Sequence, residues 1–243
     1  INKRSAVFET LISIDPKKNF VPKSKSFFLI NGVGLASARE PWVYSYNKND
    51  AITNVNLMID TYNQQRISFH KNGNSIDDYF NVPSTKISWS RSLKKDLKNN
   101  KELNYDDSAI RVALNRPFIK MHLYYEKSFI ESPGVGEKVF PKNHSNIAIT
   151  IAGKGNRKGF VSLITNILPD YNNYDGGCKY FPLYYYEEKE EVQGSLFDAT
   201  GESKFTRRDG VSNFILERAK KQYGKTVTKE DVFYYVYGVL YSP

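Results

Sequence analysis

The chain has 243 residues, of which 40% are hydrophobic and 25% are charged, a balance typical of globular proteins rather than disordered ones. Lys and Arg number 35 against 26 Asp and Glu, so the formal net charge is +9, which favours an anionic partner, nucleic acid ahead of a membrane surface. No apolar run approaches the roughly 18 residues that a membrane-spanning helix needs. A single cysteine, Cys178, excludes an intrachain disulfide and a zinc site built from several cysteines, and it is consistent with a reducing cytoplasm.

The first quarter of the chain is predicted to hold short strands and one helix. Residues 1–26 are basic and carry strand-like pieces that could complete a sheet. Phe27–Ile30 is predicted to be a short buried strand before a glycine turn at 31–34, and alternation at Trp42–Tyr46 predicts another strand. Asp50 can cap an amphipathic helix. The apolar face of that helix consists of Ile52, Val55, Ile59 and Tyr62.

A second amphipathic helix is predicted at Ser88–Asn99. Trp89, Leu93 and Leu97 fall on one side of it. The opposite side is basic and consists of Arg91, Lys94, Lys95 and Lys98. Such a face can lie along DNA phosphates, where each cation releases counterions, or it can be an ordinary solvated helix face.

The rest of the chain mixes strands and helices. The predicted strands are Ile110–Tyr125, which Pro117 interrupts, then Asn146–Ala152, Phe160–Thr165 and Tyr180–Tyr186. An acidic loop follows at 187–202, and helices are predicted near 209–222 and 229–240. Because the order is not a regular βαβ alternation, we predict an α+β fold with a mixed or antiparallel sheet core and flanking helices. The chain is predicted to be one domain, or two lobes with a boundary near 105–110.

The last predicted helix is densely aromatic. Thr228 is placed to cap it, with Asp231 three residues on. Its apolar residues follow at helical spacing and are Val232, Phe233, Val236, Tyr237, Val239 and Leu240. Nothing follows in the sequence to cover this face. We therefore interpret the chain as part of a larger protein, with a covering segment beyond Pro243 or in the body of the parent.

The usual local signatures of catalysis are missing from the sequence. It has no Gly-x-x-x-x-Gly-Lys-Ser/Thr loop, no Asp/Asn-Pro-Pro-Tyr segment of an amino-methyltransferase and no His-Glu-x-x-His. His70, His122 and His144 are far apart and have no ligand-spaced neighbours. We therefore assign no catalytic residue and no metal ligand, and a nuclease site assembled in three dimensions stays an alternative hypothesis.

Several basic segments are candidates for DNA contact. The segment 153–159 imitates a phosphate-binding loop, with Lys154, Arg157 and Lys158 among glycines, but a strand rather than a helix follows, so we predict a basic hairpin loop. Arg207 and Arg208 are predicted to lie in a polar loop that could reach a groove, as are Asn172, Asn173 and Lys179.

Two further arginines stand next to turns. Arg39 could fork onto guanine or a phosphate, with Glu40 accepting from cytosine or orienting Arg39; alternatively, the two close a loop over a buried Trp42. Pro117 bends its strand, so Arg116 and Lys120 could contact phosphates, or Arg116 could satisfy loop carbonyls instead.

Taken together, the motifs resemble the C-terminal specificity domain of Type ISP restriction–modification enzymes. The strings that carry the resemblance are Ala38-Arg-Glu-Pro-Trp-Val-Tyr44, Tyr62-Asn63, Ile87-Ser-Trp-Ser-Arg91, Arg116-Pro-Phe118, Leu123-Tyr-Tyr125, Phe181-Pro-Leu-Tyr-Tyr-Tyr186 and the segment 233–243. The chain departs from the family pattern at Ser37 and Glu40, at Asn115 and at Tyr241.

The resemblance implies a domain that recognises double-stranded DNA in a sequence-specific way and has no catalysis of its own. It implies a parent polypeptide with a nuclease, a helicase-like motor and an adenine-N6 methyltransferase, which would use S-adenosylmethionine, ATP and Mg²⁺. Because specificity domains must vary where they read bases, the matching motifs are interpreted as scaffold. An RNA-binding or protein-interaction module is the remaining alternative.

Overall fold

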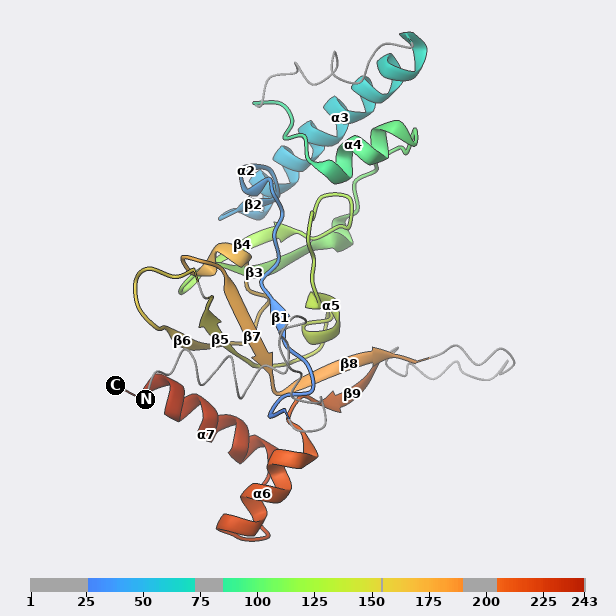
Figure 1. Cartoon of the computed structure of the whole chain (residues 1–243). Coiled ribbons are helices and arrows are strands. Elements are labelled where there is room, and N and C mark those ends of the chain that lie inside the picture. The colour runs from blue at the N-terminus through green and yellow to red at the C-terminus, as the bar shows by residue number, and fades with distance from the viewer. Residues whose placement is uncertain (1–25, 73–84, 154, 190–204, 243) are drawn as a thin grey trace, which may run out of the picture. The chain divides into compact units, whose positions relative to one another are not determined.

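The computed structural model describes residues 26–72, 85–153, 155–189 and 205–242. Contacts divide them into two compact units: unit 2 is Leu35–Gly134, and unit 1 combines the described residues up to Gly34 with those from Val135 onward. The fold is α+β, as predicted, with antiparallel sheets and flanking helices in place of a βαβ alternation (Figure 1). The strand-like pieces predicted within 1–25 lie outside the described residues.

The predicted boundary near 105–110 is wrong, because that region lies inside unit 2. The Tyr62 hydroxyl donates to the carbonyl oxygen of Lys101 (2.8 Å), and the Asn63 amide bonds both backbone groups of Leu103. A little further on, the backbone N–H of Asp106 donates to the Tyr124 hydroxyl (3.0 Å). Residues 101–106 are therefore hydrogen-bonded to side chains that precede them and follow them in unit 2.

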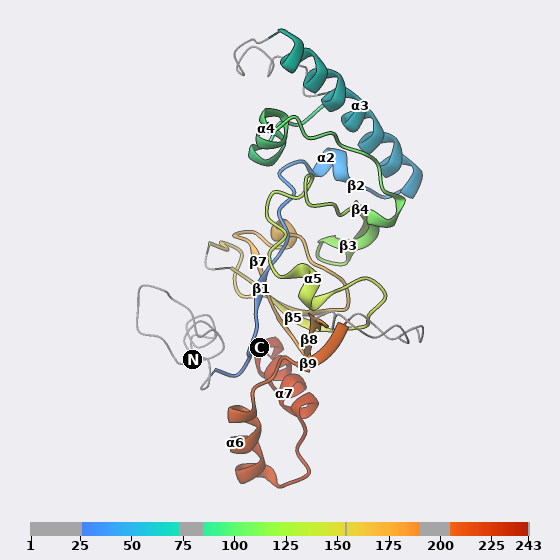
Figure 2. The ribbon, with the colours of Figure 1, turned by 90° about the vertical axis from the view of Figure 1, so that its right-hand side faces the viewer.

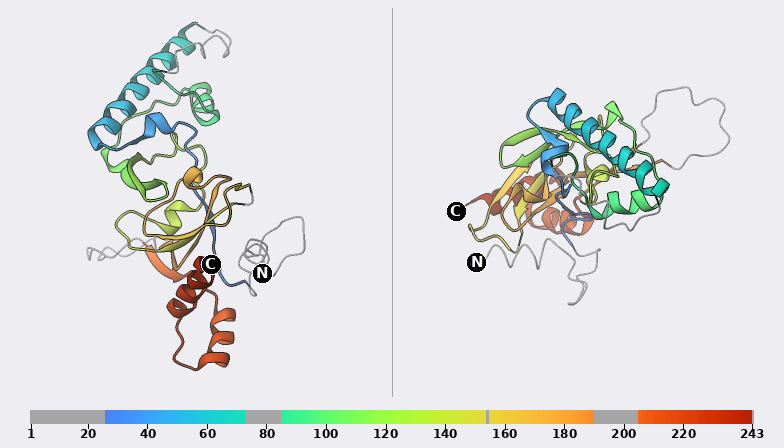
Figure 3. Two further views of the ribbon diagram at one scale, coloured as in Figure 1. Left: turned by 90° about the vertical axis from the view of Figure 1, so that its left-hand side faces the viewer. Right: turned by 90° about the horizontal axis from the view of Figure 1, so that it is seen from above.

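Unit 2 places helices beside a small antiparallel sheet of order β2-β4-β3. Its elements are α2 (Glu40–Val43), β2 (Tyr44–Ser45), α3 (Lys48–Asn72), α4 (Arg91–Lys98), the 3₁₀ turn η4 (Asp107–Ala109), β3 (Ile110–Arg116) and β4 (Ile119–Tyr124). The second half of α3 lies beside α4 (Figure 3, left). The His70 ring bonds the carbonyl oxygen of Leu97 at 2.8 Å.

Two local predictions in unit 2 need correction. The strand predicted at Trp42–Tyr46 begins only at Tyr44, because Pro41 favours a first helical turn and the Arg39 carbonyl accepts the N–H groups of Trp42 and Val43. The α3 helix begins before Asp50, and the Asn47 side chain accepts the N–H of Asn49 (2.8 Å) at its start.

Unit 1 is built on a four-stranded antiparallel sheet of order β1-β7-β5-β6 and a separate two-stranded ribbon, β8–β9. Its strands are β1 (Gly32–Val33), β5 (Ala148–Ala152), β6 (Ser162–Thr165), β7 (Cys178–Pro182), β8 (Tyr184–Glu188) and β9 (Phe205–Asp209). Its helices are α5 (Gly136–Val139), the 3₁₀ turn η5 (Tyr171–Asn173), α6 (Asn213–Tyr223) and α7 (Lys229–Tyr241). In Figure 2, α6 and α7 lie together at the end of this unit.

The first strand of unit 1 is not where the sequence predicted it. Phe27–Ile30 forms only a single bridge, from Phe28 to Val211, and β1 occupies Gly32–Val33 inside the predicted turn. The Tyr180 ring lies over Gly32, where a Cβ would come within 2.1 Å of it. Glycine at this position therefore serves close strand packing rather than a turn.

The closing helix is covered by its own unit. Thr228 and Asp231 form the predicted capping box. Phe233 is fully buried and makes an edge contact with Phe28, at a centroid distance of 6.3 Å. Val232, Val236 and Leu240 are buried in the same core as residues of β5 and β7. The core of unit 1 therefore covers most of this face, whereas Val239 is 48% exposed, and a covering segment outside the chain stays a prediction.

Candidate nucleic-acid interface

Arg39 lies in the interior of unit 2, with 2% of its surface exposed. One terminal nitrogen of its guanidinium donates to the Ser128 carbonyl oxygen (3.0 Å), and the other donates to the Ser90 hydroxyl. Its Cζ lies 6.0 Å from the centre of the Phe129 ring. The prediction that Arg39 contacts guanine or phosphate is wrong, because every group it contacts is internal.

Burial lowers the pKa of Arg39 but leaves the guanidinium charged. Desolvation lowers its pKa to about 10, although the charges of Glu131, Asp96 and Glu126 act in the opposite direction. The guanidinium therefore stays charged at neutral pH, and it connects the start of α2 to the cap of α4. In this way a loop arginine fixes the position of the α4 helix.

The α4 helix presents the basic surface that the sequence predicted, over Arg91–Lys98 rather than Ser88–Asn99. Ser90 caps it by accepting the N–H of Leu93, while Leu93 and Leu97 are buried beneath it. We define the α4 face as the exposed cations Arg91, Lys95 and Lys98. Lys94 is only partly exposed and stands beside this face.

Glu131 anchors the first turn of α4. Its carboxylate accepts the backbone N–H of Ser92 (3.1 Å) and pairs with Nε of Arg91 (3.2 Å). Burial raises the pKa of Glu131, but hydrogen bonds from Ser92 and Ser90 and the charge of Arg91 more than offset this, so the net pKa lies below its usual value. The Arg91 side chain is still 92% exposed and remains able to reach a ligand.

The β3–β4 hairpin carries the next two candidates. Arg116 pairs with Glu40 (2.9 Å) and donates to the carbonyl oxygen of Asn115 (2.8 Å). The predicted Arg39–Glu40 pair is therefore replaced by a Glu40–Arg116 pair. Trp42 is buried, as expected for the alternative in which this loop closes over it. Lys120 is exposed in β4, near the hairpin tip.

The loop between β5 and β6 is a basic hairpin loop, as predicted from 153–159, and Lys154 lies outside the described residues. Nε of Arg157 lies 3.3 Å from the carboxylate of Asp175, and Lys158 is exposed. The bond from Arg157 and the charges of Arg157 and Lys158 hold the pKa of Asp175 below its usual value. The turn at Gly176 packs so closely on Asn156 that a Cβ there would lie 2.2 Å from its backbone nitrogen.

The loop predicted for Arg207 and Arg208 is wrong, because both residues lie on the strand β9, which pairs with β8. As consecutive strand residues they lie on opposite faces of the β8–β9 ribbon. The guanidinium of Arg207 lies 4.3 Å from the centre of the Tyr184 ring. Nε of Arg208 bonds the carboxylate of Glu187 at 3.0 Å. Both arginines are exposed, yet each is oriented by a neighbouring side chain on β8.

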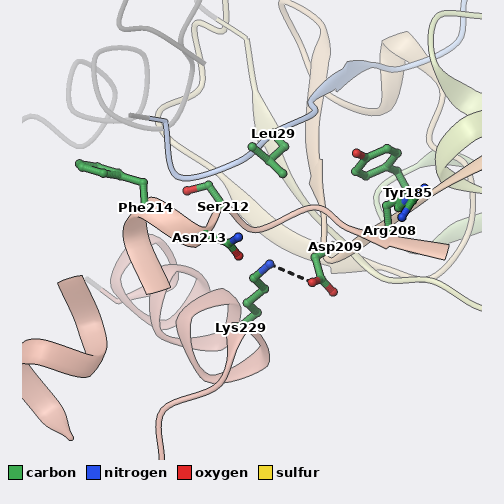
Figure 4. Close-up of a pocket in the computed structure, with 8 residues that line it drawn as sticks. All are labelled: Leu29, Tyr185, Arg208, Asp209, Ser212, Asn213, Phe214 and Lys229. Carbon is green, nitrogen blue, oxygen red and sulfur yellow. Dashed lines mark hydrogen bonds and ion pairs between the residues drawn. The ribbon is translucent and has the colours of Figure 1, made fainter. Parts of the chain in front are cut away.

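A hollow of about 420 Å³ lies along this ribbon, where α6 and α7 begin (Figure 4). It is lined by Leu29, Tyr185, Arg208, Asp209, Ser212, Asn213, Phe214 and Lys229. Lys229 and Asp209 form an ion pair at 2.8 Å within it (Figure 4). The hollow therefore combines aromatic walls with a cation, an amide and a carboxylate, the donors and acceptors that base edges require.

The remaining polar candidates are structural. Asn173 is buried and its amide approaches Cys178 Sγ (3.9 Å). Asp170 caps the 3₁₀ turn η5 by accepting the backbone N–H of Asn172 (2.7 Å), and the Asn172 residue itself is exposed. Burial raises the pKa of the Cys178 thiol to about 12, so this thiol stays protonated.

Neither a metal centre nor a membrane span emerges from the described parts of the chain. Within them, no group of three or more His, Cys, Asp and Glu side chains is arranged to hold a metal ion. No helix there is long and apolar enough to cross a bilayer.

Comparison with protein families identifies the class. Residues 26–243 match the model of the Type ISP C-terminal specificity domain, so the chain belongs to this family. The match spans both units of the structure. A search of curated proteins found no match.

Solved structures resemble the chain over most of its length. The ATP-dependent Type ISP restriction-modification enzyme LlaBIII bound to DNA is 29% identical, with a TM-score of 0.76 over 99% of this chain. A nuclease-deletion mutant of the Type ISP restriction-modification enzyme LlaGI in complex with a DNA substrate mimic is 28% identical, with a TM-score of 0.72 over 90% of it. A DrdV–DNA complex, 23% identical, shares the fold, with a TM-score of 0.75 over 92%. The chain spans 14%, 18% and 20% of those chains, respectively.

Sequence reasoning missed most of the hollow beside the ribbon. Arg208 was a candidate, but Tyr185, Asn213 and Lys229 were not. They come from β8, α6 and α7, which no local motif connects. The run of three tyrosines at 184–186 was the one available signal, since alternation on a strand places Tyr184 and Tyr185 on opposite faces.

Proposed function

We propose that this chain recognises a DNA target for a Type ISP restriction–modification enzyme and carries out no catalysis itself. The observation that carries the proposal is the family match over 26–243, together with two DNA-bound relatives at 28–29% identity. The surface agrees, because exposed cations gather on α4 and on β9 in a chain of net charge +9.

The two cationic surfaces suit different tasks. On the α4 face the cations end long, exposed side chains, which suits contacts to phosphates at any sequence. On the β8–β9 ribbon, Arg208 is oriented by Glu187 beside the hollow, and a two-stranded ribbon fits a major groove. We assign phosphate positioning to the α4 face and base reading to the ribbon.

The parent protein and its chemistry belong to the same proposal. The chain would present its site to an adenine-N6 methyltransferase and to a nuclease and motor elsewhere in the polypeptide, in the cytoplasm. S-adenosylmethionine, ATP and Mg²⁺ would be held by those domains, as the resemblance to Type ISP enzymes implies. The residues of this chain would only bind and orient the duplex.

The test is selection from a pool of randomised duplexes with the full-length protein, followed by gel shift at low and physiological salt. We expect one asymmetric sequence to be enriched and to bind about 10³-fold or more tightly than unrelated duplexes. Equal binding to all duplexes, preference for RNA, or no binding at low salt would each contradict the proposal.

A further inference from the structure

The tip of the β3–β4 hairpin breaks a rule of turn chemistry. Pro117 and Phe118 form a two-residue loop between Arg116 and Ile119, the last paired residues of the two strands. Phe118 has a φ of +65°. The second position of such a turn normally holds Gly or Asn, because a bulky side chain is strained at positive φ.

Burial does not compensate for this strain. The Phe118 side chain is 82% exposed, the largest value among the large hydrophobic residues in the described parts of the chain. Neither the turn nor the core of unit 2 therefore explains a phenylalanine here. A residue that breaks a local rule without gain to folding marks a site of function.

The stem beneath the ring is held firmly. Arg116 is fixed by Glu40 at 2.9 Å and by the carbonyl oxygen of Asn115 at 2.8 Å. Asn115 is buried, and the pairing register shifts between Leu114 and Arg116, which is the mark of a β-bulge that re-aims a strand. Pro117 fixes its own backbone angle. The ring is thus presented on a preorganised support, so ordering it on binding costs little entropy.

The surroundings of the ring suit nucleic acid. Lys120, two residues on, is exposed, and Val112 and Ile119 add exposed apolar surface on the same hairpin. Apolar wedges flanked by cations are used by DNA-binding proteins to enter a base step, while the cations neutralise nearby phosphates.

We propose that Phe118 inserts at one base step of the target duplex and unstacks it. This inference rests on the proposed function and deepens it, since it assigns an indirect, deformation-based contribution to specificity. It replaces, for Phe118, the interpretation of the Arg116-Pro-Phe118 string as scaffold, because a residue that is 82% exposed supports no core. Arg116 and Glu40 act as positioning residues for the hairpin tip, and Lys120 contacts the adjacent phosphate.

The test compares the full-length wild type with Phe118→Gly and Phe118→Trp on the duplex selected from the randomised pool. Glycine accepts the positive φ, so Phe118→Gly should keep the wild-type melting temperature. We expect it to bind the selected duplex about ten-fold or more weakly, the scale of one lost base–aromatic contact. It should also lose one permanganate-reactive thymine at a fixed position, whereas Phe118→Trp should retain both the affinity and the reactive thymine.

Tyr223→Ala is the matched control, because Tyr223 is an exposed aromatic residue (68%) on α6 of unit 1. It should leave affinity and the permanganate pattern unchanged. Unchanged affinity and pattern in Phe118→Gly would overturn the inference, and so would a melting temperature that falls in proportion to the lost binding. If Phe118→Gly kept its DNA binding but no longer associated with another protein, the inference would also be overturned, and the ring would be assigned to a protein partner. If the wild type bound no duplex, the proposed function itself would fail and this inference with it.

Discussion

The α4 face of unit 2 and the β8–β9 ribbon of unit 1 carry the same charge in different settings. On α4, Lys95 and Lys98 extend from an exposed helix turn above buried leucines. On the ribbon, Arg207 lies against Tyr184 and Arg208 is bonded to Glu187. Cations on exposed side chains add affinity that salt removes, whereas oriented guanidinium groups distinguish one partner from another. Net charge therefore predicts a nucleic-acid partner, while the neighbours of each cation predict its task.

The largest expected effect concerns the support of the α4 face. Arg39→Ala should destabilise the chain by about 3 kcal/mol, because it opens a cavity and removes the guanidinium bonds to the Ser128 carbonyl and the Ser90 hydroxyl. Urea unfolding followed by circular dichroism measures the change. Arg157→Ala, at an exposed ion pair, is the control and should cost less than about 0.5 kcal/mol.

The same variant also tests the comparison. If Arg39→Ala were as stable as the wild type but lost DNA binding, Arg39 would be a DNA contact after all. We expect the opposite result: Arg39→Ala should lower the free energy of unfolding, and the molecules that remain folded should keep their preference for the selected duplex.

The second prediction concerns the ribbon. Arg208→Ala should weaken binding to the selected duplex by about 1–3 kcal/mol and bind unrelated duplexes nearly as before, because a lost base contact removes discrimination. Competition gel shifts with single-base variants of the selected duplex measure it. Glu187→Gln, which weakens only the orientation of Arg208, should cost a fraction of that amount.

Equal weakening on every duplex would make Arg208 a phosphate contact and would remove the difference between the two surfaces. Arg207→Ala provides the internal comparison on the opposite face of the same ribbon.

The third prediction concerns the α4 face itself. Lys95→Gln combined with Lys98→Gln should weaken binding to all duplexes alike and lower the slope of log affinity against log salt by about 2, near one per lost phosphate contact. Fluorescence anisotropy across a salt series measures the slope. Lys220→Gln with Lys221→Gln, in the last turn of α6, is a charge-matched control and should leave the slope unchanged.

The helices and most strands of this fold follow from periodicity. Leu93 and Leu97 predicted the buried side of α4, and Thr228 with Asp231 predicted the start of α7. The antiparallel pairing of β5 with β6 agrees with the basic hairpin loop that was predicted between these two strands. These features are decided within about ten residues, which is the range that a local pattern covers.

The candidate site followed less closely, because its partners are distant in sequence. Arg39 is buried by Ser90 and Ser128, which lie 51 and 89 residues further on, and Glu40 pairs with Arg116, 76 residues further on. The strain at Phe118 arises from a turn geometry that a Pro-Phe pair does not announce. Exposed cations on regular elements, such as Lys95, Lys98 and Arg208, were the candidates that local patterns could find.

The smallest expected effect is a pH dependence at the base of α4. Because the pKa of Glu131 is below its usual value in the folded chain, Glu131 stabilises the fold above its unfolded pKa of about 4.3, and that contribution is lost as pH falls through the folded value. The wild type should therefore lose some unfolding free energy below pH 5, and Glu131→Gln should lose less of it. The difference should be under about 1 kcal/mol, since Arg91 is exposed and solvent weakens the pair. Urea midpoints at several pH values measure this, and Glu217→Gln, on exposed α6, is the control. If Glu131→Gln followed the wild-type pH profile, the carboxylate would not hold α4, and the ordered first turn would depend on Ser90 and Arg39 alone.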